Sequence, residues 1–271
     1  MKIDSFFKFH VYYVTGLAGM IAAIAAAATY DLWLWLLAGF IYARFTMLFG
    51  AHIGLHRYFA HNAFKTTAVK HKIIAWLSFL SGEGSPIMWF VHHNHHHTHA
   101  DQELDISSPK EGLFKAFLWN LRSEEHWRKK KVRIFPKHLF KDKTVRFIHE
   151  NYFKLWIAIG LAALLIDWKV FLFLVLFPIG HNNLVSVIMA VLLHVKMPGS
   201  YRNYETDDIS WNNRYQALAM LAEGYHNNHH RFPSAYDQAM RPGEFDFGGW
   251  IVKKLFLEKA DISHSDLTAK S

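Results

Sequence analysis

Long apolar segments separated by short charged turns constrain this fold more than any other feature of the sequence. Residues 11–30 form an uncharged run of 20 residues, which as a helix crosses the roughly 30 Å of a bilayer's hydrocarbon core. A second apolar segment, 32–55, follows closely, which favours a transmembrane hairpin over a cleaved signal peptide. The segments 152–166 and 170–195 form a second pair. The sequence therefore predicts an all-α membrane protein with four transmembrane helices in two hairpins.

The distribution of basic residues predicts the orientation of these helices. Of the 30 Lys and Arg residues, sixteen lie within 57–150 and nine after residue 195, whereas the two outer turns hold only Lys169. The positive-inside rule then predicts that both termini and a helical cap, residues 56–150 and 196–271, lie on the cytoplasmic side of a bacterial inner membrane or an equivalent membrane. We expect one domain over residues 1–271.

The formal net charge of +8 fits this sidedness better than nucleic-acid binding. The basic run 128–133 is interpreted as a segment at the membrane surface, and no nucleic-acid partner is expected. Residues 73–80 are apolar but are followed by a Gly- and Pro-containing break at 82–86. We interpret this segment as an interfacial helix, because a fifth span would separate the histidines on its two sides.

Histidines outside the predicted spans are clustered, and the chain has 20 histidines but no cysteine. The lack of cysteine excludes disulfide scaffolds, thiolate nucleophiles and thiolate-held metals. Residues i, i+3 and i+4 share one face of a helix, so two of the clusters can each direct three imidazoles toward one point. In the other cluster a spacing of five predicts that the second histidine lies past the helix end. The clustered residues are His56 and His61; His93, His96 and His97; His226, His229 and His230; and His194, which ends the fourth apolar segment.

Nine imidazoles are too many for one zinc ion, but they suit two metal ions with four or five nitrogen ligands each. The ligand type alone does not name the metal. Soluble di-iron bundles use two Glu-x-x-His pairs, and this chain has only Glu223 with His226, so that architecture does not fit. For the second cluster the register His92, His95 and His96 also satisfies the spacing. Isolated histidines are read as ordinary polar residues: His10, His71, His126, His138, His149 and His264.

The three histidine clusters resemble those of the integral-membrane fatty acid desaturases of the acyl-CoA or acyl-lipid delta-9 kind. The resemblance covers about residues 32–246 and favours His93 over His92 as the start of the second cluster. It rests on the stretches HRYFAH, HNHHH and HNNHH, together with Gly54, Trp89, Asp101, Asp105, Pro109, Glu223, Gly224 and Pro233.

The resemblance implies a cytoplasmic cap that holds two iron ions on the nine clustered histidines. It also implies O2 as co-substrate and a fatty acyl chain, as acyl-CoA or acyl-lipid, from which two hydrogens are removed. Carboxylates commonly hydrogen-bond metal-bound imidazoles and fix their tautomers. We expect this role from Glu223, Asp101 and Asp105.

Three departures from the family pattern leave the reaction open. Ala190 stands where such enzymes usually have an Asn four residues before the histidine of the fourth helix. The stretch 105–108 lacks the usual Asp-Pro-His-Ser pattern, and no histidine follows Gly112, where Phe117 and Trp119 occur. A fatty acid or alkane hydroxylase and an oxidative decarboxylase are therefore alternatives. A non-catalytic membrane metal binder is a further alternative, although the spans hold few polar ligands.

The remaining expectations concern the substrate and the electron donor. A tunnel between the helices would take the acyl chain, with Phe40, Tyr42 or Phe173 at its closed end. No haem-binding or cysteine-bearing donor domain is fused to the chain, so we expect a separate ferredoxin- or cytochrome-type donor. A basic cytoplasmic surface suits an acidic partner of this kind.

Overall fold

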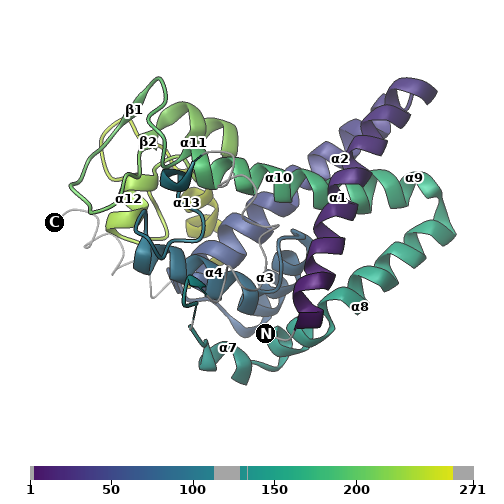
Figure 1. The fold of residues 1–271 in the computed structure, drawn as a ribbon, viewed down its shortest axis with the longest axis horizontal. Coiled ribbons are helices and arrows are strands. Elements are labelled where there is room, and N and C mark those ends of the chain that lie inside the picture. Colours follow the sequence, from purple (N-terminus) through teal and green to yellow (C-terminus); the bar gives the residue numbers. More distant parts are fainter. Residues whose placement is uncertain (1–2, 113–128, 133, 259–271) are drawn as a thin grey trace.

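The computed structural model describes residues 3–112, 129–132 and 134–258. Most of them are helical, and Figure 1 shows long helices on one side and a cluster of short helices and loops on the other. The Arg128 and Arg133 ends of the predicted basic segment lie outside the described residues, as do Phe117, Trp119, His126 and His264. The α-helices are α1 (Ile3–Tyr30), α2 (Trp33–Thr46), α3 (Ala68–Leu80), α4 (Pro86–His99), α7 (Lys137–Lys141), α8 (Lys143–Ile166), α9 (Trp168–Phe171), α10 (Phe177–Leu192), α11 (Arg214–Met220), α12 (His226–Arg231) and α13 (Phe247–Ile251).

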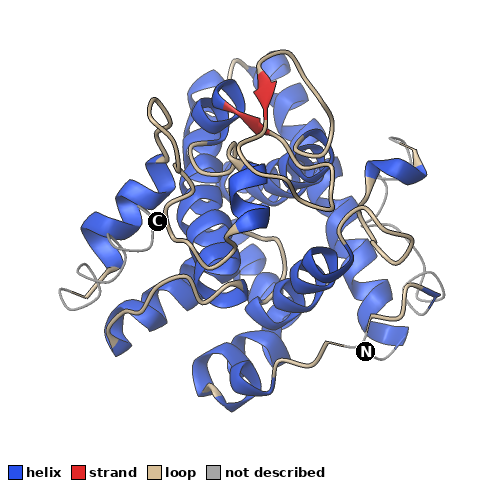
Figure 2. Ribbon diagram, turned by 90° about the vertical axis from the view of Figure 1, so that its left-hand side faces the viewer, coloured by secondary structure: helices blue, strands red, loops and turns tan. Residues whose placement is uncertain are grey.

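Shorter or differently wound segments complete the fold. Three are π-helical, η1 (Met47–Ala60), η4 (Leu172–Leu176) and η5 (Val252–Phe256), and η2 (Pro109–Glu111) is a 3₁₀ turn. Strands β1 (Ser200–Tyr201) and β2 (Asn212–Asn213) pair antiparallel, with Ser200 opposite Asn213, and are seen in Figure 2.

Within the described residues, three helical stretches are long and apolar enough to cross a membrane: Lys8–Tyr30, Trp33–Ala60 and Trp168–Leu192. Two of these stretches are made of consecutive helices without a break: α2 continues into η1, and α9 continues through η4 into α10. These helices indicate a membrane protein. The predicted fourth span, 152–166, is part of α8, which starts at Lys143 because the Asp142 carboxylate caps it by accepting a hydrogen bond from the Val145 amide at 2.9 Å.

Glycines allow the long helices to pack closely. A side-chain carbon added at Gly180 of α10 would lie 2.2 Å from the carbonyl oxygen of Gly16 in α1, and one at Gly39 would lie 2.4 Å from the Phe173 carbonyl. Small residues commonly mediate such contacts between membrane helices. The outward faces carry large exposed apolar side chains such as Leu34 and Leu165, which suit a lipid environment. We call α1, α2, η4 and α10 the stem.

The short helices and loops of the C-terminal part pack against the end of η1, and one buried ion pair joins them. Arg57 is 1% exposed and donates to an Asp246 carboxylate oxygen at 2.7 Å and to the Tyr236 carbonyl at 2.7 Å. It also donates to the Ala222 carbonyl. Because unpaired buried charges are unstable, these contacts fix the C-terminal segment over the end of η1, next to the histidines. We call residues 56–112 and 193–258 the histidine-bearing cap.

Candidate metal centre

The nine histidines singled out from the sequence lie in two groups. His56, His61, His93, His97 and His229 form the five-histidine group, and His96, His194, His226 and His230 form the four-histidine group. Within each group one nitrogen from every ring lies within 4.8 Å of those of the others. His92 and His95 belong to neither group, and the His95 Nε2 instead lies 2.9 Å from the Leu104 carbonyl oxygen.

The ring nitrogens that face one another are spaced as ligands of one ion would be. The Nε2 atoms of His56 and His229 are 2.9 Å apart, and those of His61 and His93 are 2.7 Å apart. The Nε2 atom of His226 lies 3.0 Å from that of His194. Two nitrogens about 2.1 Å from a metal ion and at right angles to each other would lie about 3.0 Å apart. The spacing of these nitrogens therefore fits ligands of a shared metal ion.

Each histidine cluster on a helix is divided between the two groups. His93 and His97 of α4 enter the five-histidine group, whereas His96 enters the other. On α12 the division is reversed, because His229 joins the five-histidine group. Residues i and i+4 differ by about 40° around a helix and residue i+3 lies about 60° to the other side. The prediction that each cluster points at one place is therefore wrong, since the i+3 ring turns to the second group.

The spacing of five between His56 and His61 also has a structural explanation. As predicted, His61 lies past the helix, which ends at Ala60. The π-helical winding of η1 has i to i+5 hydrogen bonds, and the His61 amide donates to the His56 carbonyl at 3.1 Å. The two rings are consequently neighbours, with centroids 5.0 Å apart.

Carboxylates contact the outer Nδ1 atoms of four of these histidines. The expected residues are in place: Asp101 lies 2.7 Å from His194, Asp105 3.0 Å from His96, and Glu223 2.9 Å from His56. Asp208, which the sequence analysis missed, lies 3.0 Å from the Nδ1 of His230. A carboxylate at Nδ1 keeps a proton there and leaves Nε2 free as a metal ligand. Asp208 lies in the irregular segment between β1 and β2, where no periodicity marks it.

Burial sets the protonation of the rings in the cap. It lowers the pKa of His226 and His229 well below the ordinary value, and neighbouring histidines add to this effect. Neutral imidazoles are the form that binds a metal ion. His96 differs: burial opposes protonation, but the charge of Asp105 and its hydrogen bond raise the pKa of His96.

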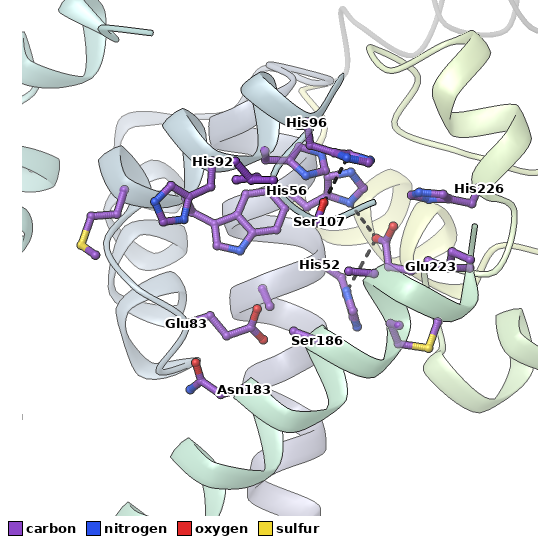
Figure 3. A pocket seen from close by; sticks show the side chains of 18 of the residues that line it. His52, His56, Glu83, His92, His96, Ser107, Asn183, Ser186, Glu223 and His226 are labelled. Carbon is purple, nitrogen blue, oxygen red and sulfur yellow. Dashed lines mark hydrogen bonds and ion pairs between the residues drawn. The ribbon is translucent and has the colours of Figure 1, made fainter. Parts of the chain in front are cut away.

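A cavity of about 150 Å³ opens beside both histidine groups (Figure 3). His56 and His93 of the five-histidine group and His96 and His226 of the four-histidine group line it. The rest of its wall is largely apolar and includes Phe9, Met88, Trp89, Ile106, Met189 and Leu193. Ala190, the residue that departs from the family pattern, also lines this cavity.

The cavity wall also holds polar residues that the sequence analysis did not assign. Glu83, in the break between α3 and α4, projects into the cavity near Ser186 (Figure 3). Its Oε1 atom is buried and makes no hydrogen bond to the described residues. His52 lines the wall on the histidine side, one π-helical turn before His56. From the sequence, Glu83 was recognised only as part of the break at residues 82–86.

Phe40, Tyr42 and Phe173, which were expected to close the tunnel, do not line this cavity, so their role at the closed end of a tunnel stays a prediction. Phe40 is 46% exposed on the outer face of α2. Phe173 is fully buried, but it packs in the stem with Ala43 and Phe177. Phe173 therefore serves helix packing.

Comparison with known proteins agrees with this geometry. The model of the fatty acid desaturase family matches residues 9–242, which is most of the chain. The chain belongs to the fatty acid desaturase family. Enzymes of this family are oxidoreductases of lipid metabolism, and the two histidine groups are capable of binding metal.

Curated relatives are similar at moderate identity. A hex-5-enoyl-[acyl-carrier protein] acetylenase of Moorena producens is 28% identical over 78% of this chain and 71% of its own length. The delta-9 acyl-lipid desaturase 2 of Arabidopsis thaliana is 28% identical over 75% of this chain and 66% of its own. An sn-1 stearoyl-lipid 9-desaturase of Anabaena variabilis is 27% identical over 76% and 74%, respectively.

Proposed function

We propose that this desaturase uses O2 to insert a cis double bond, at the delta-9 position, into an acyl-CoA or acyl-lipid chain. The observation that carries the proposal is one cavity with a largely apolar wall that is lined by histidines of both groups. A methylene segment in this cavity would lie directly against both metal positions. The delta-9 position follows the names of relatives such as the delta-9 acyl-lipid desaturase 2 of Arabidopsis thaliana.

The nine histidines would hold two iron ions, which supply the power to oxidise an unactivated carbon–hydrogen bond. In the overall reaction the chain loses two hydrogens, and O2 takes these with two electrons and two protons to form two water molecules. Asp101, Asp105 and Asp208 accept hydrogen bonds from the Nδ1 atoms, which keeps the protons there and holds the rings in position, and Glu223 lies 2.9 Å from the Nδ1 of His56. The contribution of the protein is thus to fix nitrogen ligands and, at buried rings such as His226 and His229, to favour the neutral form.

The cavity binds and shields the reacting part of the chain. Its volume of about 150 Å³ resembles that of an apolar protein cavity that binds benzene, so it encloses a short segment and not a whole fatty acid. Met88, Met189 and Leu193 supply flexible apolar contacts. Exclusion of water by such a wall protects a reactive centre from side reactions.

Orientation and electron supply complete the proposal. We place both termini and the histidine-bearing cap on the cytoplasmic side, with α8 as the fourth membrane helix, so that the helices form two hairpins. The excess of Lys and Arg within residues 57–150 and after residue 195 supports this side. A separate acidic carrier of the ferredoxin or cytochrome type would bring the electrons, guided by this positive charge.

Lipid profiling of a host that lacks desaturation tests the proposal. The chain is expressed with a ferredoxin-type donor, and a new cis-monounsaturated acid is expected. His138→Ala serves as a matched control for His229→Ala, because His138 is exposed and belongs to neither histidine group. An unchanged lipid profile in the presence of an active donor would overturn the proposal.

Ala190 keeps alternative reactions open. This alanine stands at the position, four residues before His194, where family members usually have an Asn, and it lines the same cavity. Hydroxy acids or terminal alkenes in the same lipid profile would identify a hydroxylase or a decarboxylase instead. A triple bond would match the acetylenase of Moorena producens, for which the assay includes an acyl-carrier-protein thioester.

A further inference from the structure

Negative charge is divided unequally between the two histidine groups. Three of the four histidines in the four-histidine group have a carboxylate at Nδ1: His194 with Asp101, His96 with Asp105 and His230 with Asp208. In the five-histidine group, the described part of the structure shows such a contact only for His56, with Glu223. The groups thus differ by two carboxylates in direct contact with their rings.

The single carboxylate of the five-histidine group is also shared. Its Oε1 lies 3.6 Å from the guanidinium of Arg57 and 3.7 Å from the Nδ1 of His52. Arg57 is a permanent cation buried in the same region. Part of the negative charge of Glu223 is therefore balanced before it acts on His56.

The three aspartates of the four-histidine group are oriented by neutral donors. Asp101 accepts hydrogen bonds from the Ser108 hydroxyl at 2.8 Å and from the Ile209 amide at 2.9 Å. Asp105 accepts from the amides of Asp101 and Ser107 at 2.8 and 2.9 Å. Asp208 accepts from the Ser210 amide at 2.8 Å. These bonds fix the carboxylates without cancelling their charge, so all three remain directed at imidazoles.

The two groups also differ in exposure. Three members of the four-histidine group are buried and only His230 is half-buried, whereas His61, His93 and His97 of the five-histidine group are half-buried. An ion in the four-histidine group is consequently better shielded from water, and the charges around it act through a lower dielectric.

We infer that the two metal positions are unequal, and that the four-histidine group binds its ion more tightly and releases it last. The inference rests on the proposed two-metal function. Each carboxylate partner of a ligand histidine typically changes metal affinity 10- to 100-fold. Two additional carboxylates therefore favour the four-histidine group by about 10²- to 10⁴-fold, and the one extra neutral imidazole of the five-histidine group acts against this difference.

Equilibrium metal titration of the full-length protein in detergent tests this inference. Metal-free protein is titrated anaerobically with Co²⁺ or Fe²⁺ against a competing chelator, and bound metal is counted by mass spectrometry. We expect two steps, with one ion retained where the other is lost. Asp208→Asn should weaken the tighter step by about 10- to 100-fold, and Glu223→Gln should weaken only the looser one. Asp167→Asn, in the turn between α8 and α9, is the control and should change neither step.

Single histidine variants assign the steps. His61→Ala should remove the looser step and His194→Ala the tighter one, with circular dichroism showing that helix content is retained. Two ions bound with equal affinity, or an effect of Asp208→Asn on the looser step, would overturn the inequality while leaving the two-metal function intact. Protein that binds no metal would overturn both.

Discussion

The stem and the histidine-bearing cap differ in what stabilises their buried side chains. In the stem, helices approach through glycines, as at Gly16 and Gly180, and large apolar side chains face outward. In the cap, buried histidines are held by carboxylates, and Arg57 is buried with Asp246. The stem therefore depends on the volume of side chains, whereas the cap depends on the pairing of charges and hydrogen bonds. The cavity lies where the two regions meet, so that apolar walls adjoin polar ligands.

The largest effect is expected in the cap at a proposed ligand. His229→Ala removes an imidazole whose Nε2 lies 2.9 Å from both His56 and His97. We expect desaturase activity to fall at least about 10³-fold, because ligand loss disables the metal centre as a unit. Iron content should fall in parallel, measured on purified protein. Full activity in this variant would refute the ligand assignment, and His138→Ala should retain both activity and iron.

A loss of charge pairing should strongly destabilise the cap. Arg57→Met leaves the Asp246 carboxylate, which lies 2.7 Å from the guanidinium, buried without its cation. Removing one partner of a buried ion pair costs about 3–5 kcal/mol, which thermal unfolding in detergent would report. The double variant Arg57→Met/Asp246→Asn should recover part of this loss. Equal stability of the single variant and the wild type would show that the pair does not hold the cap.

The stem should instead respond to added volume. Gly180→Ala places a methyl group 2.2 Å from the Gly16 carbonyl oxygen, so α1 and α10 must separate. Overpacking of this kind costs about 1–3 kcal/mol, measured as a fall in the unfolding temperature. Leu165→Ala is the matched control, since Leu165 is 89% exposed and should change stability little. A similar loss in both variants would contradict the packing argument.

The smallest effect concerns Glu83, where the regions meet. Burial raises the pKa of Glu83 from its ordinary 4.5 to about 7, against hydrogen bonds from Ser186 and Trp89. Between about pH 4.5 and 7 the native state keeps a proton on Glu83 that the unfolded state has lost. The free energy of unfolding therefore falls as the pH rises through this range, and it falls no further on account of Glu83 above about pH 7. Wild type should lose about 1–2 kcal/mol between pH 5 and 7 relative to Glu83→Gln. Parallel unfolding curves for both proteins would show that Glu83 stays ionised.

Much of the site could be predicted from residue spacing and from the resemblance to a known family. The nine histidines that spacing and resemblance selected are the ones brought together, because clusters with i, i+3 and i+4 spacing keep their rings on one side of a helix. The division of each cluster between two groups could not be predicted. It depends on how α4 and α12 are placed relative to each other, which no local pattern specifies.

Other features were hidden for the same kind of reason. Asp208 contacts His230 from a loop without periodicity. The preceding residue, Asp207, is also an aspartate, so the sequence does not show which of the two contacts a histidine. The predicted fourth span was recognised only by its apolar half, whereas α8 begins earlier, in a charged stretch that includes Arg146 and Glu150. Charged residues hide a helix from a search based on hydropathy, although they do not stop it from forming.

The sequence by itself determined which segments are apolar enough for a membrane and which histidines are available as ligands, because both follow from residues close together in the chain. Tertiary structure alone decided which carboxylate meets which ring. Asp101 and His194 are 93 positions apart and Glu223 and His56 are 167 apart, yet both pairs are in contact. Folding must bring such partners together before either can set the protonation of the other, so the electrostatic difference between the two histidine groups exists only in the folded protein.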